Sequence, residues 1–343
     1  MKVLLGMSGG VDSTYAVHEL RRMGYEVFGA VILMHEYTET EEAKLSAEAL
    51  GVPLYVIDGR RLFEEKVISS FMNEYCSGRT PNPCIICNRE VKFKLLLDFA
   101  LENGFDKIAT GHYADIVTIS DENGTRHALR RSEDEKKDQT YMLYRLGEDV
   151  LSHLVFPLSK LTKENVKREA EKMELRAAYR GESQEICFIP DNDYAGYIEA
   201  RCGKCPEGNF VDENGKILGR HKGIIHYTVG QRKGLGIALG ERAFITEINP
   251  ETNDITLSTK DSFADSFFIS DIVFSGLLSA KCGDEVELFV KHRYLAPLAK
   301  ARVSFLENGR AKVTLETPAR AVTPGQSAVF YKDGVLMMGG IIE

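Results

Sequence analysis

A short segment rich in glycine and serine, Ser8–Ser13, has the composition of an anion-binding turn. It reads Ser-Gly-Gly-Val-Asp-Ser, follows the apolar run Val3–Gly6 and opens an amphipathic stretch, so we expect a strand, a turn and a helix in that order. Glycines let the backbone approach a phosphate, and the N–H groups at a helix start favour negative charge. Asp12 can hold Mg²⁺ against pyrophosphate oxygens. The segment has neither the Gly-Lys-Ser/Thr of kinase-type loops nor the Gly-x-Gly-x-x-Gly of dinucleotide folds.

Cysteines provide a second kind of chemistry. Cys84 and Cys87 form a C-x-x-C pair, and Cys187 stands about a hundred residues further on. The pair precedes the start of an expected helix, where the helix dipole and two nearby arginines, Arg79 and Arg89, are expected to lower a cysteine pKa. A cysteine of that kind can carry or resolve a persulfide. Cys187 is the candidate partner of the pair.

The first part of the chain alternates apolar runs with amphipathic ones. Strands are expected at 3–6, 27–33, 54–57 and 107–110, and helices at 12–23, 41–50, 62–75, 88–103 and 162–174. Strands that alternate with helices of this length predict an α/β fold, in which a doubly wound parallel sheet is covered on both faces.

The character of the sequence changes after Pro206. Runs of β-branched residues are separated there by turn signals, at 213–215, 250–253, 307–309 and 332–334. Asn-Gly and Asp-Gly between alternating strands predict hairpins. We therefore expect three domains: an α/β domain at 1–205, a central small β-rich domain at 206–265 and a C-terminal β-barrel-like domain at 266–343.

Charge and hydrophobicity limit the partners only loosely. The net charge of the 343 residues is −8, which taken alone disfavours a polyanionic partner. Basic residues are nevertheless clustered, at 216–233 and again at 291–293, so the charge neither supports nor excludes RNA. No apolar run approaches the roughly 20 residues of a membrane span. The first strand leaves no room for a signal peptide, so a cytoplasmic location is expected.

The glycine- and serine-rich segment resembles the loop of the ATP-pyrophosphatase superfamily, whose members adenylate an oxygen to make it a leaving group. Further segments are similar to those of the bacterial tRNA-specific 2-thiouridylase family. They run in family order over almost the whole chain: Gly6–Ser13, Gly78–Pro83, Cys87–Phe93, Ala109–Tyr113, Lys137–Tyr141, Ser183–Ile189, Tyr227–Gly236 and Thr323–Ala328.

This resemblance implies a reaction and its partners. ATP, with Mg²⁺, adenylates the 2-oxygen of the wobble uridine in tRNAs for Glu, Gln and Lys, and pyrophosphate is released. Sulfur carried as a persulfide on Cys187 then displaces AMP, with Cys87 assisting as nucleophile and Asp12 as the third catalytic residue. The partners implied are tRNA and a sulfur donor, which is a cysteine desulfurase, a sulfur-relay protein or free sulfide.

Binding residues follow from the same resemblance. The ATP site would comprise Gly6, Met7, Ser8, Gly9, Gly10, Val11, Asp12, Ser13, Ile32 and Gly111. Contacts to tRNA would come from Asn82, Pro83, Cys84, His112, Lys137, Asp138, Gln139 and Gln326, and from Arg293 and Tyr294 near the target base. Lys and Arg pair with phosphates, and Tyr offers a stacking face. Structural roles are the alternative: His112 as a strand-end cap, Arg293 and Tyr294 as a surface pair, and Gln326 as part of a turn.

Cys84 departs from the family pattern, which most often has Asp at this position. With Cys87 and Cys187 it makes three thiols in one expected site, a donor set that suits a 4Fe–4S cluster with one open iron. Two other interpretations stay open. One is a third thiol in persulfide chemistry, and the other is a zinc site, to which the second C-x-x-C pair, Cys202 and Cys205, could add ligands.

Two competing functions stay in view. One is a superfamily thiolase or ligase that acts on another base or on a metabolite. The other, from a different class, is a tRNA-binding or sulfur-carrier protein without turnover. The Ser8–Ser13 segment disfavours the second, since binding alone does not need a grip on pyrophosphate.

Overall fold

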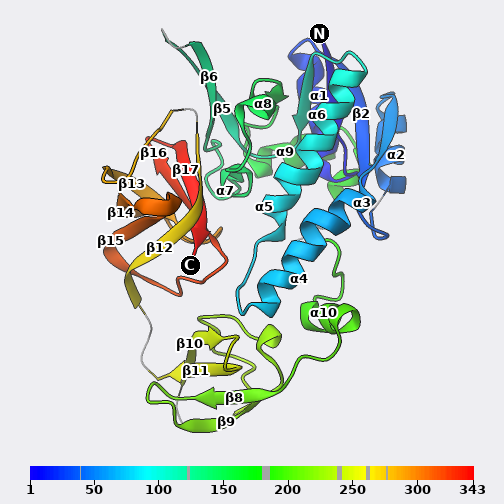
Figure 1. The fold of residues 1–343 in the computed structure, drawn as a ribbon. Helices are drawn as coiled ribbons and strands as arrows, with labels where there is room; N and C mark the ends of the chain where they lie inside the picture. Colours follow the sequence, from blue (N-terminus) through cyan, green and yellow to red (C-terminus); the bar gives the residue numbers. More distant parts are fainter. Residues whose placement is uncertain (39, 122–123, 180–185, 238–241, 260–262, 276) are drawn as a thin grey trace.

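The computed structural model describes residues 1–38, 40–121, 124–179, 186–237, 242–259, 263–275 and 277–343. In Figure 1 the first part of the chain builds an α/β unit, the yellow-green part a small sheet below it, and the orange-to-red part a barrel beside it. The motif Ser183–Glu185 lies outside the described residues.

The α/β unit is built on a parallel sheet with the strand order β3-β2-β1-β4-β7. The strands are β1 (Lys2–Gly6), β2 (Glu26–Leu33), β3 (Leu54–Asp58), β4 (Lys107–Thr110) and β7 (Leu154–Val155). From β1 the chain builds outward in both directions, so β1 and β4 flank the point where the strand order reverses. Ligands of open α/β sheets bind at the carboxyl ends of such strands. Gly6 lies opposite Thr110 at this edge.

Helices cover both faces of this sheet. Val3 and Leu5 of β1 pack with helix α1 (Val11–Arg22) and helix α9 (Lys163–Lys172), while Leu4 faces the other way, toward α6 (Phe93–Glu102). This alternation is the period of two of a strand buried on both faces. The remaining helices are α2 (Thr40–Ala49), α3 (Arg60–Phe63), α4 (Ser69–Cys76), α5 (Pro83–Cys87), α7 (Thr140–Leu143), α8 (Glu148–Leu151) and α10 (Tyr194–Cys202).

Two π-helical turns interrupt helices of the α/β unit, and the second lies in the helix that carries Cys84 and Cys87. Glu64–Ile68 lies between α3 and α4, and Asn88–Lys92 lies between α5 and α6. A π turn inserts a residue into a helix and often occurs at a functional site. The second turn places Lys92 on the helix that also carries Cys84 and Cys87.

The later part of the chain forms two β structures. The smaller sheet has the order β10-β11-β8-β9, built from Phe244–Asn249, Asp254–Ser258, Gly208–Val211 and Ile217–His221. In the larger, β12 (Phe263–Phe274), β15 (Ala311–Arg320), β14 (Ala299–Phe305), β13 (Glu285–Lys291), β16 (Ser327–Lys332) and β17 (Val335–Ile342) form a ring. The pairing of β12 with β17 closes it into a barrel. A hairpin from the α/β unit, β5 (Asp115–Asp121) and β6 (Gly124–Arg130), extends this sheet through β17.

The expected α/β fold followed by two β-rich parts is confirmed. The helix expected at 88–103 begins earlier, at Pro83, because the Asn82 side chain accepts from the backbone N–H of Cys84 and Pro83 suits the first helical position. The expected boundary at 265 falls inside β12. The division at 205 stays a prediction.

Candidate active site

The Ser8–Ser13 loop joins β1 to α1 and is held by its own hydroxyl groups. The backbone N–H of Ser8 donates to Oγ of Ser13 at 3.1 Å, and the two hydroxyl oxygens lie 3.2 Å apart. Ser13 in turn donates to the Gly10 carbonyl at 3.1 Å. Gly10, the residue before α1, has no side chain with which to cap the helix. The first N–H groups of this helix therefore remain available to an anion, as the sequence predicted.

Two glycines are required by close backbone approaches to this loop. Gly9 has a φ of +77°, and a Cβ there would lie 2.7 Å from Glu42 of α2. A Cβ on Gly111, just after β4, would lie 2.8 Å from the backbone nitrogen of Ser13. The end of β4 thus packs directly on the start of α1. Met7 is buried, with an exposed fraction of 2%, so only its backbone is left to face a ligand.

Asp12 is held by two residues that the sequence analysis did not single out. Its Oδ1 accepts from the Tyr113 hydroxyl at 2.9 Å, and its Oδ2 accepts from the Lys163 ammonium at 2.6 Å. Lys163 is the first residue of α9, so a second helix brings a positive charge to the loop. Lys163 is 151 residues from Asp12 in the sequence, so no local pattern indicates that the two side chains form a pair.

Cys84 and Cys87 have unlike surroundings, and the expectation of a lowered pKa at Cys87 is wrong. Because α5 begins at Pro83, Cys84 occupies the helix start and is exposed, whereas Cys87 lies about one turn further along, just before the π turn, and is buried. The Cys87 thiol donates to Sδ of Met34 at 3.6 Å. Burial raises the pKa of Cys87 to about 12.

The two arginines expected near these thiols have other partners. Arg79 pairs with Glu74 at 2.8 Å, and Arg89 pairs with Asp149 at 3.2 Å. The expected contribution of both to a thiolate is therefore wrong, since carboxylates already neutralise them. The positive charge that acts on the thiols comes from a lysine, Lys92.

Lys92 is the cation of the thiol cluster, which we define as Cys84, Cys87 and Cys187. Burial lowers the Lys92 pKa, but its interactions with the three cysteines outweigh that effect and raise it. Burial also raises the pKa of Cys187, although part of this residue is exposed. The charge of Lys92 lowers that pKa, but by less than burial raises it. Lys92 thus lies within electrostatic range of all three predicted cysteines.

The thiol cluster is not arranged as a ready metal centre. Within the described residues, no group of three His, Cys, Asp or Glu side chains is placed to hold a metal ion. Three cysteine thiols are donors of the kind that a 4Fe–4S cluster or zinc takes. Cys202 and Cys205 lie elsewhere, at the end of α10 and beyond it.

His112 follows the glycine that packs on the loop and lies within electrostatic range of Lys92. It follows Gly111, its Nδ1 lies 2.8 Å from Oγ1 of Thr110, and its ring lies 5.7 Å from that of Phe93, centroid to centroid. Burial, and then the Lys92 charge, lower the pKa of His112 to about 3. The imidazole is therefore neutral at physiological pH. Its bond to Thr110 caps the end of β4.

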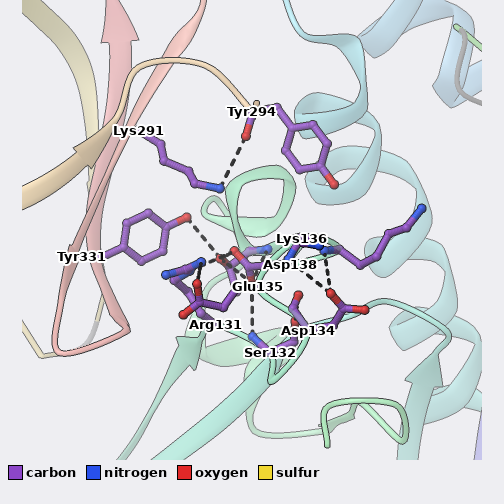
Figure 2. Close-up of polar contacts among 11 residues, drawn as sticks. Arg131, Ser132, Asp134, Glu135, Lys136, Asp138, Lys291, Tyr294 and Tyr331 are labelled. Carbon is purple, nitrogen blue, oxygen red and sulfur yellow. Dashed lines mark hydrogen bonds and ion pairs between the residues drawn. The ribbon is translucent and has the colours of Figure 1, made fainter. Parts of the chain in front are cut away.

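The residues proposed for tRNA differ in what they can offer. Asp138 is buried: its carboxylate accepts from Thr140 Oγ1 at 2.8 Å and from the Ser132 N–H at 3.2 Å. Figure 2 shows Asp138 inside a polar network, and a direct contact of this residue with tRNA stays a prediction. Gln139 accepts from the Tyr113 N–H at 2.9 Å. Lys137 occupies the same segment and has a polar or electrostatic partner.

The segment before Cys84 is similarly committed to structure. Pro83 is buried, and the Asn82 side chain accepts from the Cys84 N–H and donates to Sδ of Met142 at 3.4 Å. Of Asn82, Pro83 and Cys84, only Cys84 is exposed. The tRNA contacts of this segment stay a prediction. Ile32, expected at the ATP site, lies half-buried near the end of β2.

Gln326 belongs to a junction of three parts of the chain at Thr80. Its amide donates to the Thr80 carbonyl at 2.7 Å, and the Thr80 N–H donates to the Pro324 carbonyl at 3.0 Å. The Thr80 hydroxyl lies 3.2 Å from that of Thr228. Three of the recognised segments therefore meet at the loop that leads to Cys84.

Arg293 and Tyr294 lie on the loop between β13 and β14. Arg293 is exposed, but Tyr294 is half-buried and its ring lies 6.0 Å from that of Tyr141, centroid to centroid. Of the two, Arg293 is the one that faces solvent.

A parallel sheet with a glycine- and serine-rich phosphate loop at its switch point defines an ATP-pyrophosphatase type of α/β protein. Family models described as a tRNA methyl transferase HUP domain, its PRC-barrel domain and an aminomethyltransferase β-barrel domain match residues 1–191, 196–259 and 264–342. The chain belongs to this family, that of the proteins named tRNA-specific 2-thiouridylase MnmA.

Curated relatives with that name match over their whole length. The protein from Clostridium perfringens is 45% identical, covering 100% of this chain and 98% of the relative. The one from Acetivibrio thermocellus is 44% identical, covering 100% and 99%. None of the helices that the structure describes has the length and apolar character of a membrane span.

Proposed function

We propose that this protein uses ATP to convert the wobble uridine of tRNAs for Glu, Gln and Lys to 2-thiouridine, releasing AMP and pyrophosphate. The observation that carries the proposal is the placement of the thiol cluster beside the loop. Gly111 packs on Ser13, and the next residue, His112, lies within electrostatic range of Lys92, which is itself within electrostatic range of the three thiols. The names of full-length relatives support the same reaction. Methyl transfer, which the family's domain names mention, would require neither feature.

ATP is bound with its phosphates at the loop. The uncapped N–H groups of α1 and the Ser8 hydroxyl donate to the phosphates, while Ser13 holds the loop through Ser8 and Gly10, and Lys163 adds positive charge. Asp12 supports one Mg²⁺ contact, in line with the habit of Mg²⁺ to take one or two carboxylates together with substrate phosphates. Gly6–Ser13, Ile32 and Gly111 line this site.

Sulfur arrives as a persulfide on Cys187, with Cys87 as the second nucleophile. The terminal sulfur bonds to C2 of the adenylated uridine, and AMP leaves with the former 2-oxygen. Cys87 then attacks the Cys187 sulfur, a disulfide forms, and the electron pair of the broken S–S bond goes to the thiocarbonyl. A dithiol reductant restores the thiols. The charge of Lys92 stabilises the thiolates of Cys87 and Cys187, because it opposes the rise in pKa that burial causes at both residues.

A cluster-dependent route is the second candidate, and the gathering of three cysteines favours it. A 4Fe–4S group, when bound by Cys84, Cys87 and Cys187, would supply an open iron for sulfide. Iron content of anaerobically purified protein separates the routes: about four irons per chain supports the cluster, and an active iron-free protein excludes it.

The partners are tRNA and a sulfur donor, which is a cysteine desulfurase, a relay protein or sulfide. Contacts to tRNA come from Arg293, Lys137 and Cys84, with His112, Gln139 and Gln326 shaping the surface around them. The compartment is the cytoplasm, where the tRNA substrate is found. The three domains act together at the Thr80 junction.

Two measurements test the proposed function. Pyrophosphate release by the purified protein should require unmodified tRNA, and nucleoside mass spectrometry of that tRNA should show 2-thiouridine. Cys187→Ser should abolish thiolation, whereas Cys282→Ser, at an exposed cysteine of the barrel, should not. Release of pyrophosphate with a metabolite or with a different modified base would favour the alternative ligase or thiolase. Binding of tRNA without any pyrophosphate release would favour a carrier or binding protein.

A further inference from the structure

The carboxylate of Asp138 is the centre of a buried polar network between the α/β unit and the barrel. Thr140 donates to it, Arg131 approaches its Oδ2 to 3.6 Å, and the hydroxyl of Thr140 lies 3.1 Å from that of Tyr331 in β16. Burial raises the pKa of Asp138. A carboxylate removed from water in this way has to be stabilised by donors and positive charge.

Lys291, the last residue of β13, brings a further ammonium group to this network. Its exposed fraction is 9%, and its Nζ donates to the carbonyl of Tyr294 at 3.4 Å. Burial lowers the Lys291 pKa, while Asp138 and Glu135 attract its charge and Arg131 opposes it. Figure 2 shows Lys291 extending from the barrel between the Tyr294 carbonyl and the Asp138 segment.

The loop that Lys291 contacts has an inner and an outer side. On the inner side Tyr294 packs on Tyr141, whose hydroxyl donates to the Ser327 carbonyl at 2.8 Å. On the outer side Arg293 is exposed and Leu295 has an exposed fraction of 88%. The Ala296 N–H donates to the Arg293 carbonyl at 3.1 Å and closes the turn. A bond from inside to the Tyr294 carbonyl therefore fixes which residues of the loop face outward.

We propose that Lys291 is the positioning residue of this loop: its ammonium bonds the Tyr294 carbonyl and faces Asp138, and it thereby holds Arg293 toward tRNA. The proposal rests on the proposed function for the identity of the ligand. Lys291 itself is too buried to contact a phosphate. It acts through Arg293, so its removal should matter only while Arg293 is present.

Binding of unmodified tRNA tests this at fixed salt concentration. Lys291→Met should raise the Kd by about tenfold, the size expected for one lost hydrogen bond from a charged donor, and leave ATP binding unchanged. Lys291→Arg should recover most of the loss. Lys300→Met, at an exposed lysine on the neighbouring strand, is the matched control. In an Arg293→Ala background, Lys291→Met should add little, since both changes disable the same loop. Full additivity, or an unchanged Kd, would overturn the proposal.

A second measurement does not depend on the reaction. The sequence contains no Trp, so Leu295→Trp places a single indole on the outer side of the loop. Its fluorescence anisotropy should fall in Lys291→Met and stay constant in Lys300→Met. Equal anisotropy in both would refute the positioning role even if the protein proved to have another substrate. A wild-type protein that neither binds nor thiolates tRNA, but shows the anisotropy change, would contradict the proposed function alone.

Discussion

The Lys163 ammonium donates to Oδ2 of Asp12 at 2.6 Å and joins the first turn of α9 to the first turn of α1. The side chain of Lys163 is 13% exposed and that of Asp12 31%, so the pair is partly shielded from water. The carboxylate is thus oriented before ATP binds, by Lys163 on one oxygen and Tyr113 on the other. Preorganised charge of this kind lowers the reorganisation that a reaction requires.

Replacement of Lys163 should therefore impair ATP use. Lys163→Met should lower kcat/KM for ATP by about 100-fold, because a positive group at the phosphates is lost. Lys160→Met is the control, since Lys160 pairs with Asp115 and is 58% exposed. Steady-state pyrophosphate release measures both. Near-normal kcat/KM in Lys163→Met would show that the pair only supports the fold.

The glycines at the strand ends should differ in their tolerance of a methyl group. Gly111→Ala places a Cβ within 2.8 Å of the Ser13 nitrogen, whereas Gly6→Ala makes contacts of 3.6 Å or more. We expect Gly111→Ala to raise the KM for ATP by about tenfold or more, because the start of α1 has to shift. Gly6→Ala should change it by less than about threefold. Equal KM values in the two variants would contradict this steric account.

Alkylation should distinguish the three thiols of the cluster. Iodoacetamide at about pH 8 should modify exposed Cys84 early and buried Cys87 last, since thiolate is the reactive form and burial opposes it. Lys92→Met should slow modification of Cys87 and Cys187 further, and Lys92→Arg should not. Peptide mass spectrometry follows each site, with exposed Cys282 as internal reference. Early labelling of Cys87 would show that it is open to solvent.

Stability should depend on pH through Cys87 in a defined direction. Its folded-state pKa is raised to about 12, so the folded form holds a proton that the unfolded form releases above about pH 9. The contribution is complete below that pH and is lost as pH rises toward 12. Wild type should therefore lose about 1.4 kcal/mol per pH unit more than Cys87→Ala over this interval. Urea unfolding at several pH values measures it; parallel curves for the two proteins would rule it out.

Much of the α/β unit could be predicted because its signals are local. Apolar runs, the Ser8–Ser13 turn and the Asn-Gly or Asp-Gly pairs at 213–215, 307–309 and 332–334 each specify structure within a few residues. The β5–β6 hairpin has the same Asn-Gly signal at 123–124, so it could have been found by the same rule.

The site was harder to predict because its properties depend on distant parts. An earlier helix start places Cys87 inside the helix, buried against Met34, and not at an exposed N-terminus. Asp138 lies between Lys137 and Gln139 and has the sequence of a surface position, yet Thr140 and Tyr331 of the barrel help to enclose it. The π turn that carries Lys92 has no known local signature. Such burial arises only from tertiary packing.

The Thr80 junction also bears on the order in which the enzyme can be made. Thr80 takes its partners from Thr228 and from Pro324 and Gln326, which leave the ribosome long after it does. Domains generally fold in the order of synthesis, so the nucleotide fold can form on the nascent chain while the loop before Cys84 still lacks its partners. A chain that ends before Pro324 would keep the Ser8–Ser13 loop but would lack the bonds from Thr80 to Pro324 and Gln326. The loop before Cys84 therefore obtains all its partners only after the segment that leads into β16 has been made.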